Sequence, residues 1–263
     1  MVGAAQPRRP PVLLTCSTRP GGESWGAPPS LQHPAAGVAV FRLPVAASGI
    51  FAPQAAALLQ AEELRRAQRY HRPADYQRFV LGRAAQRLVL GAYLGLPPGG
   101  LHFEPGPNSK PQLREAPQLH YNVSHAGDWV LLAVAGAGVG VDVERLDAQF
   151  AFRELLDHSF SPAEKAFIER SPVPHHAFYQ LWTRKEAFVK ATGQGIDDTF
   201  SQVPALDGEH RLAGGRLGWA VRSFEVAAGY AAAVACPASL AEALHFYDLD
   251  GTALRELYAA ALR

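Results

Sequence analysis

The sequence contains little cysteine: only Cys16 and Cys236 among its 263 residues carry a thiol. Two cysteines far apart in the chain provide neither the disulfide framework of a small secreted protein nor a cysteine-rich metal site. We therefore expect a protein that works in the reducing cytoplasm.

The sequence also lacks a long apolar run and a marked excess of charge of either sign. No stretch approaches the roughly 20 apolar residues that a membrane helix needs. The first residues show no basic start followed by a sustained apolar core, so a secretory signal is not expected. The formal net charge of +1 gives no reason to expect nucleic acid or a membrane as partner. A local basic cluster remains able to bind an anionic ligand.

The composition divides the chain into an extension and two halves. Residues 1–36 are rich in proline, glycine, alanine and serine, which predicts a flexible N-terminal extension. Residues 37–146 read as a strand, two helices and further strands, and residues 147–263 as helices followed by strands. We therefore expect an α+β fold of two similar subdomains, 37–146 and 147–263. Within the first, the strands on either side of 136–138 are expected to form a hairpin.

The stretch "VGVDVERLD" places two carboxylates on one face of a strand. Its valines alternate with Gly140, Asp142 and Glu144, and alternate side chains leave the same face of a strand, so the two carboxylates lie roughly 6–7 Å apart. A solvated strand face is the simpler interpretation. Carboxylates that leave room for water and phosphate oxygens are, however, the usual ligands of Mg²⁺.

A later stretch, "FYQLWTRKEAFVKATGQG", supplies a third carboxylate. Phe178, Trp182, Glu186 and Lys190 recur every four residues and form one stripe on the expected helix. A surface ion pair between Glu186 and Lys190 would explain their spacing without a function. Alternatively, Glu186 completes a magnesium half-shell and Lys190 neutralises a phosphate on the same metal.

These two stretches together resemble the Sfp-type 4′-phosphopantetheinyl transferases. Members of that family carry G-(I/V)-D-(I/V)-E and W-x-x-K-E-(A/S)-x-x-K at comparable separation, and this chain has "GVDVE" and "WTRKEAFVK". In the same order, "SKPQL" is similar to the family's G-K-P segment and "YNVSHAGDWVLLAV" to its N-(I/L/V)-S-H-S strand. The run "RRAQRYHRPADYQRFVLGRA" looks like its basic entry region. The resemblance covers residues 38–238.

The resemblance implies a magnesium-dependent site for coenzyme A. Asp142, Glu144 and Glu186 would bind Mg²⁺ together with the pyrophosphate, and Lys190 would contact that pyrophosphate; these four would be the catalytic residues. The remaining residues that the family pattern assigns to coenzyme A are Lys110, Pro111 and Ser124 around the adenine and ribose, His125 at the 3′-phosphate with Arg65, Arg66 and Arg69, and Trp182 on the cleft wall.

Two positions depart from the family pattern. Ser109 replaces the usual glycine before Lys-Pro, which alters a turn that glycine tolerates better. Ala126 replaces the usual second serine after Ser-His. Neither position is a metal ligand, and among the arginines we expect Arg66 to be the first to meet a phosphate.

The resemblance also implies the reaction. The enzyme would move the phosphopantetheine arm of coenzyme A to a serine of an apo acyl or peptidyl carrier protein and release 3′,5′-ADP. Carriers of fatty-acid, polyketide or peptide synthesis all fit as partners. The chain length matches the family's pseudo-two-fold monomer, in which two similar halves are joined. The general base would be Glu186 or a metal-bound water.

Three other interpretations can be compared with this one. A coenzyme A-binding or carrier-binding module without catalysis would share the same residues. A chitinase-like glycosidase also uses acidic strand ends, but it needs a (β/α)₈ barrel, for which this chain lacks strand–helix units. A Ser–His nucleophile at Ser124 and His125 is excluded because neighbouring side chains on a strand face opposite ways.

Overall fold

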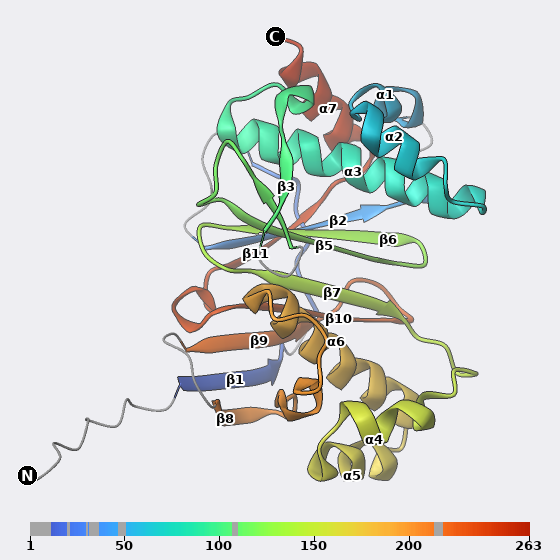
Figure 1. Cartoon of the computed structure of the whole chain (residues 1–263), viewed down its shortest axis with the longest axis vertical. Helices are drawn as coiled ribbons and strands as arrows, with labels where there is room; N and C mark the ends of the chain where they lie inside the picture. The colour runs from blue at the N-terminus through green and yellow to red at the C-terminus, as the bar shows by residue number, and fades with distance from the viewer. Residues whose placement is uncertain are drawn as a thin grey trace, which may run out of the picture.

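Two mixed sheets lie edge to edge in the computed structural model, which describes residues 12–19, 22–29, 31, 37–46, 51–106, 110–212 and 218–263 (Figure 1). The first sheet has the order β11-β2-β6-β5 and the second β7-β10-β9-β1-β8. The first is built from β2 (Val38–Pro44), β5 (His120–Ala126), β6 (Trp129–Ala135) and β11 (Leu244–Asp248). The second is built from β1 (Val12–Thr18), β7 (Gly140–Arg145), β8 (Gly208–Leu212), β9 (Trp219–Phe224) and β10 (Tyr230–Pro237). A small hairpin adds β3 (Phe103–Pro105) and β4 (Pro111–Leu113).

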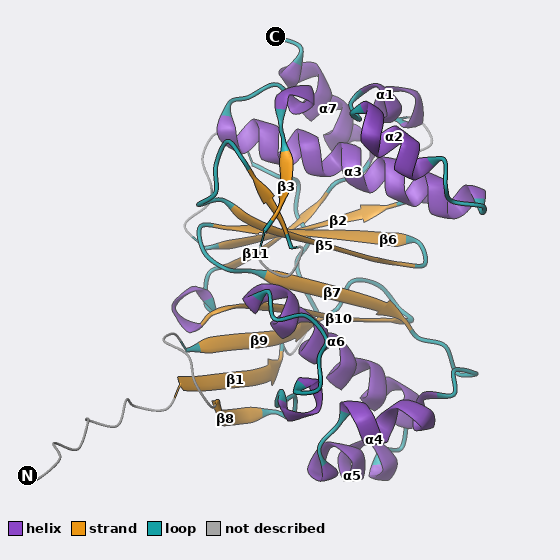
Figure 2. Cartoon of the chain, in the orientation of Figure 1, coloured by secondary structure: helices purple, strands orange, loops and turns teal. Residues whose placement is uncertain are grey.

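Helices cover each sheet at its own end of the molecule (Figure 2). Those at the first sheet are α1 (Ala52–Ala57), α2 (Ala61–Ala67), α3 (Pro73–Leu94) and α7 (Gly251–Ala261); those at the second are α4 (Leu156–Ser159), α5 (Pro162–Arg170) and α6 (Pro174–Thr192). None of the helices in the described ranges has the length and apolar character of a membrane span.

The same supersecondary unit occurs once in each half. The chain runs β2-α3-β5-β6 in the first half and β7-α6-β9-β10 in the second, and in both units the last strand lies between the other two, antiparallel to each. This duplicated α+β arrangement confirms the expected fold class of two similar halves.

The expected hairpin at residues 136–138 is wrong. β6 pairs instead with β5, and the turn between them is the two-residue loop Gly127–Asp128. Gly127 has φ = 51°, the left-handed conformation that two-residue hairpins require. β7 then leaves the first sheet and pairs with β10 in the second.

Two side chains of β5 join the sheets where backbone pairing stops. The Oδ1 of Asn122 accepts from the N–H of Val141 at 2.8 Å, and the Oγ of Ser124 accepts from the N–H of Val143 at 3.3 Å. Asn122 and Ser124 are two residues apart on β5, and Val141 and Val143 are two residues apart on β7. Side chains on one face of β5 therefore accept from alternate N–H groups of β7. The "NVS" spacing thus has a structural explanation.

The expectation of a flexible extension is wrong for Val12–Thr18. This segment is β1, parallel to β9 on one side and antiparallel to β8 on the other. The cause is an alternation in which Leu14 and Cys16 are buried against α6 while Leu13 is exposed. Residues 1–11, 20–21, 30 and 32–36 of the expected extension lie outside the described residues.

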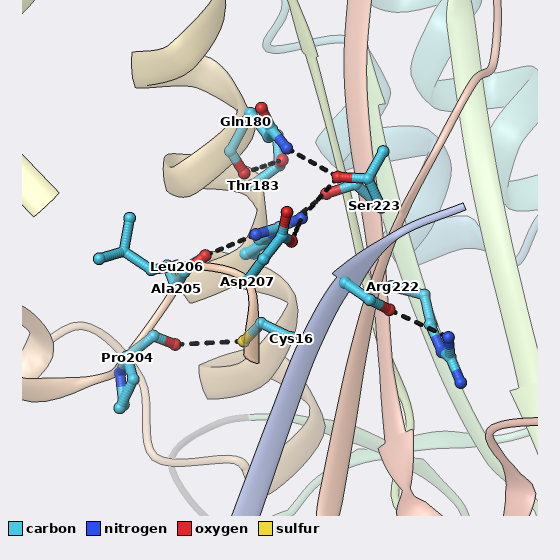
Figure 3. Close-up of polar contacts among 12 residues, drawn as sticks. Cys16, Gln180, Thr183, Pro204, Ala205, Leu206, Asp207, Arg222 and Ser223 are labelled. Atoms are coloured by element: carbon cyan, nitrogen blue, oxygen red, sulfur yellow. Dashed lines mark hydrogen bonds and ion pairs between the residues drawn. The ribbon is translucent and has the colours of Figure 1, made fainter. Parts of the chain in front are cut away.

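Arg184 ties β1 to α6 and β9. Its guanidinium is buried and donates to Thr18 Oγ1 at 2.8 Å, Ser223 Oγ at 2.7 Å and Asp207 Oδ1 at 2.7 Å. Figure 3 shows the surrounding contacts, including the Cys16 thiol near the carbonyl of Pro204.

The expected division of the chain at residue 146 stays a prediction. The strand pairing does not follow this division throughout. β7, which the division places in the first subdomain, pairs with β10 in the second sheet. In the other direction, β11 pairs with β2 in the first sheet, and Leu254 of α7 joins the core around α3.

We expect Leu14→Ala to lower the free energy of unfolding by about 2–5 kcal/mol, the usual cost of a cavity at a buried leucine. The neighbouring Leu13→Ala is the matched control and should change it by less than about 0.5 kcal/mol, since Leu13 is 41% exposed. Denaturant unfolding measures both. Equal effects of the two substitutions would show that β1 is not part of the folded sheet.

Candidate active site

β7 and α6 bring the carboxylates and the lysine of the two motifs together. Asp142 is 2% exposed, and its Oδ1 lies 2.5 Å from the Nζ of Lys190. The same Nζ lies 3.1 Å from the Oε2 of Glu186, and Ser124 Oγ donates to Asp142 Oδ1 at 2.8 Å. Of the two interpretations of Glu186 and Lys190, the surface ion pair therefore does not hold, because Lys190 faces the strand and pairs with Asp142 as well as with Glu186.

Glycine makes this approach possible. A Cβ at Gly140 would lie 2.1 Å from the carbonyl oxygen of Ala187 and 2.4 Å from the backbone nitrogen of Ala191. α6 thus packs directly on the backbone of β7, and any side chain at position 140 would push the helix away. The glycine of the "GVDVE" motif is required by this contact.

The cluster carries more negative than positive charge. Burial raises the pKa of Glu144 to about 7, with Asp142 and Glu186 adding to the effect and Lys190 opposing it. Burial and Asp142 also raise the pKa of Glu186, against the lowering effects of Lys190 and of a hydrogen bond from Trp182. Burial lowers the pKa of Lys190, but Asp142 and Glu186 raise it by more.

The carboxylate oxygens of the cluster are the type of donor that hard divalent cations prefer, although the ammonium of Lys190 lies between two of them. Asp142 Oδ2 is buried without a hydrogen-bond partner, and three carboxylates face one ammonium. Within the described ranges, no group of three or more His, Cys, Asp or Glu side chains is arranged to hold a metal ion. Binding by all three carboxylates therefore requires the ammonium of Lys190 to move toward another anion.

A basic pocket of about 190 Å³ lies on the face of β5 that carries His125, opposite to the face on which Ser124 contacts Asp142. His125 lines it, and burial together with Arg78 lowers the pKa of this histidine. Arg66 stands over the ring of Phe79, 5.3 Å from its centre. The polar and aromatic lining further includes Tyr70, Arg83, Gln86, Tyr121 and Asn122. Cations and aromatic faces together suit a phosphorylated nucleoside.

Lys110 points away from this pocket. Its ammonium lies among three backbone carbonyls, those of Val139, Lys190 and Ala191, and burial lowers its pKa to about 8. Pro111 lines the basic pocket and also a neighbouring cavity of about 290 Å³. Ser109, the departure from the family pattern, lies outside the described residues.

None of the other four predicted residues, Ser124, Trp182, Arg65 and Arg69, lines the basic pocket. Ser124 touches Asp142 and Lys190 rather than the basic pocket, and Trp182 packs among Phe178 and Phe200. Arg65 and Arg69 are exposed and are not among the residues that line the described pocket.

Sequence reasoning assigned no binding role to Arg78 or Arg83, which line the basic pocket. Their positions on α3 give the available signal: Arg78, Phe79, Gly82, Arg83 and Gln86 recur at the spacing of one helix face. Arg78 is further fixed by its Nε, which donates to the carbonyl of Gly127 at 2.9 Å.

The raised pKa of Glu144 should make the metal-free protein less stable as the pH rises. A carboxyl group with a folded pKa above its unfolded value stabilises the fold below about pH 4.5 and loses that effect as the pH rises to about 7. In Glu144→Gln, the loss of unfolding free energy with rising pH should be smaller by about 1–2 kcal/mol, a magnitude that allows for solvent screening of this partly exposed group. Unfolding at pH 5 and pH 8 with a chelator measures it, and the exposed Glu169→Gln serves as control. A pH dependence unchanged in Glu144→Gln would contradict the burial of this carboxyl.

Two family models match the two halves of the chain. The model described as 4′-phosphopantetheinyl transferase, N-terminal, matches residues 51–136, and that of the 4′-phosphopantetheinyl transferase superfamily matches residues 138–235. The first thus covers α3 and the basic pocket, and the second covers β7 and α6.

Similar proteins of three bacteria have the same description. The 4′-phosphopantetheinyl transferase HetI of Nostoc sp. is 34% identical over 175 residues, which cover 64% of this chain and 74% of HetI. Psf-1 of Bacillus pumilus is 35% identical over 53% of this chain and 60% of its own length, and Sfp of Bacillus subtilis is 27% identical over 67% and 81%. The chain thus spans about three fifths of the length of the Bacillus pumilus relative. On these matches and on the duplicated fold, the chain belongs to the 4′-phosphopantetheinyl transferase family.

Proposed function

We propose that this protein transfers the 4′-phosphopantetheine arm of coenzyme A to a serine of an apo acyl or peptidyl carrier protein and releases 3′,5′-ADP. One observation carries the proposal: the cluster of Asp142, Glu186 and Lys190 adjoins a basic pocket across β5. Ser124 faces the cluster and His125 faces the pocket. A single strand thus separates an acidic site, which would bind a cation, from a basic site, which would bind an anion, as a diphosphate with a distant third phosphate requires.

Coenzyme A would bind through its phosphates. The arginines of the basic pocket and His125 would bind the 3′-phosphate, since guanidinium groups match phosphate oxygens in pairs. The pyrophosphate would lie at the cluster, where Lys190 would exchange its bonds to Asp142 and Glu186 for a phosphate oxygen. The pantetheine arm would then leave toward the carrier protein.

The reaction needs charge neutralisation and a proton acceptor. The serine oxygen of the carrier attacks the phosphorus that bears the pantetheine arm, a new P–O bond forms, and the bond to the bridging oxygen breaks. The bridging oxygen and its electron pair leave with 3′,5′-ADP. Lys190 stabilises the negative charge that develops there.

Asp142, Glu144 and Glu186 would hold Mg²⁺. When bound, the cation supplies the positive charge that a diphosphate needs beside three carboxylates. The partnerless Oδ2 of Asp142 and the raised pKa values of Glu144 and Glu186 support this donor set.

The serine proton would pass to an acceptor at the cluster. Glu186 is held in place by Lys190, whereas the side chain of Glu144 makes no ion pair within the part of the chain that the structure describes. The pKa of Glu144, about 7 in the metal-free protein, would fall beside a cation that Glu144 itself holds. We therefore assign proton acceptance to Glu186 or a metal-bound water.

Asp142→Asn, Glu144→Gln and Glu186→Gln should each reduce transfer by about a hundredfold or more, since each removes charge at the reacting phosphate. The assay follows the mass of a panel of apo carrier domains together with released 3′,5′-ADP, at saturating coenzyme A and limiting Mg²⁺. The exposed Glu169→Gln is the control. Near wild-type transfer by any of the three variants would remove that residue from the site. Binding of coenzyme A by the wild type without transfer to any carrier would favour the inactive binding module.

The basic pocket predicts different roles for two adjacent arginines. Arg66→Gln should weaken 3′,5′-ADP binding about tenfold, the effect of one charged hydrogen bond. Arg65→Gln should change it less than about twofold, because Arg65 is exposed outside the pocket lining. Calorimetric titration without Mg²⁺ measures both. Equal losses would show that the 3′-phosphate does not enter this pocket.

A further inference from the structure

Lys110 forms a contact between the two halves that its place in the family pattern does not suggest. It immediately precedes β4 in the first half, yet its Nζ donates to three carbonyls next to the second sheet. The distances are 2.6 Å to Lys190, 3.0 Å to Val139 and 3.2 Å to Ala191.

Two of these carbonyls belong to the last turn of α6. Carbonyls at a helix C-terminus lack intrahelical partners and form the negative end of the helix dipole. A half-buried ammonium at this place satisfies them and offsets the dipole. Lys110 thus closes α6 at the end that carries Lys190.

The third carbonyl belongs to the segment that leads into β7. Val139 is the residue before β7, three residues before Asp142. The backbone oxygen of Lys190 and the side chain that reaches Asp142 and Glu186 belong to one residue. One ammonium therefore fixes both elements of the acidic cluster relative to each other.

An ammonium has three N–H donors and no acceptor. In Lys110 all three are directed at protein carbonyls, so none is left for a ribose or an adenine. This arrangement differs from the nucleotide contact that the family pattern implies for the lysine of the Lys-Pro pair.

We propose that Lys110 is a positioning residue for the transfer reaction, which holds the last turn of α6 against β7 and so places Lys190 between Asp142 and Glu186. Only the kinetic test of this inference rests on the proposed function.

Lys110→Met removes the donors and keeps most of the length of the side chain. We expect kcat to fall tenfold or more, because displacement of reacting groups by about 1 Å costs up to a hundredfold, while the Kd for 3′,5′-ADP changes less than about twofold. Lys110→Arg, which keeps charge and donors, should recover part of kcat. Lys165→Met, at a partly exposed ion pair on α5, is the matched control.

A second measurement does not require activity. Hydrogen exchange in the peptide that covers residues 186–195 should be faster in Lys110→Met than in the wild type and the Lys165→Met control. If Lys110→Met does not fold, Lys110→Arg carries both measurements, with a smaller loss of kcat at unchanged Kd.

A Kd for 3′,5′-ADP weakened more than tenfold at unchanged kcat would overturn the proposal and make Lys110 a ligand contact. Wild-type kcat and wild-type exchange in Lys110→Met would overturn it as well. If the wild type transfers nothing to any carrier, the proposed function fails, and exchange alone then decides the role of Lys110: faster exchange supports it and unchanged exchange overturns it.

Discussion

The buried carboxylate of Asp142 is the constraint around which the two halves are arranged. A carboxylate that is 2% exposed needs hydrogen bonds and a counter-charge, because burial of a charge alone would cost several kcal/mol. Ser124 from the first sheet and Lys190 from α6 supply them. Lys190 reaches Asp142 because α6 lies directly on the backbone at Gly140. The fold therefore keeps a charged group where a hydrophobic residue of similar size would pack at lower cost, which is typical of a site retained for its chemistry.

β5 contributes to both the joint between the sheets and the basic pocket, because its side chains alternate between its two faces. Asn122 and Ser124 point toward β7, replace the missing backbone pairing and hold the sheets edge to edge. His125 points the other way into the basic pocket, beside side chains of α3. The joint between the halves is thus also the wall between the acidic cluster and the basic pocket. A shift of β5 by one residue would exchange these faces and lose both at once.

The sequence was sufficient to predict the acidic cluster but not its surroundings. Asp142 and Glu144 share a face by the period of a strand, and Glu186 and Lys190 by that of a helix, so local geometry predicts each pair. The docking of α6 on β7 is a long-range contact, and only the family resemblance indicated it. β1 was missed because prolines and glycines around Val12–Thr18 hide a short alternation that is satisfied by β8 and β9, about 200 residues later. Lys110 shows the same limit, because its partners are backbone carbonyls that no residue pattern reveals. The contact of Arg78 with the carbonyl of Gly127 is of the same kind.

The basic pocket and the acidic cluster differ in charge, so they differ in whether an anionic ligand needs a cation in order to bind. The basic pocket is lined by Arg66, Arg78 and Arg83 next to a histidine whose pKa is lowered by burial and by Arg78. Arg78 and Arg83 are paired with Asp75 and Glu63, but the lining is basic, so a phosphate can bind there without a metal ion. The acidic cluster has three carboxylates beside one lysine, and burial first and then the neighbouring carboxylates raise the pKa values of Glu144 and Glu186. A diphosphate alone would add to the repulsion. Under the proposed function, the 3′-phosphate therefore supplies the affinity that does not depend on metal, while the pyrophosphate enters only together with a cation. Nucleotide binding at the pocket would then precede assembly of the reacting site, and the release of Lys190 from Asp142 would accompany the second step rather than the first.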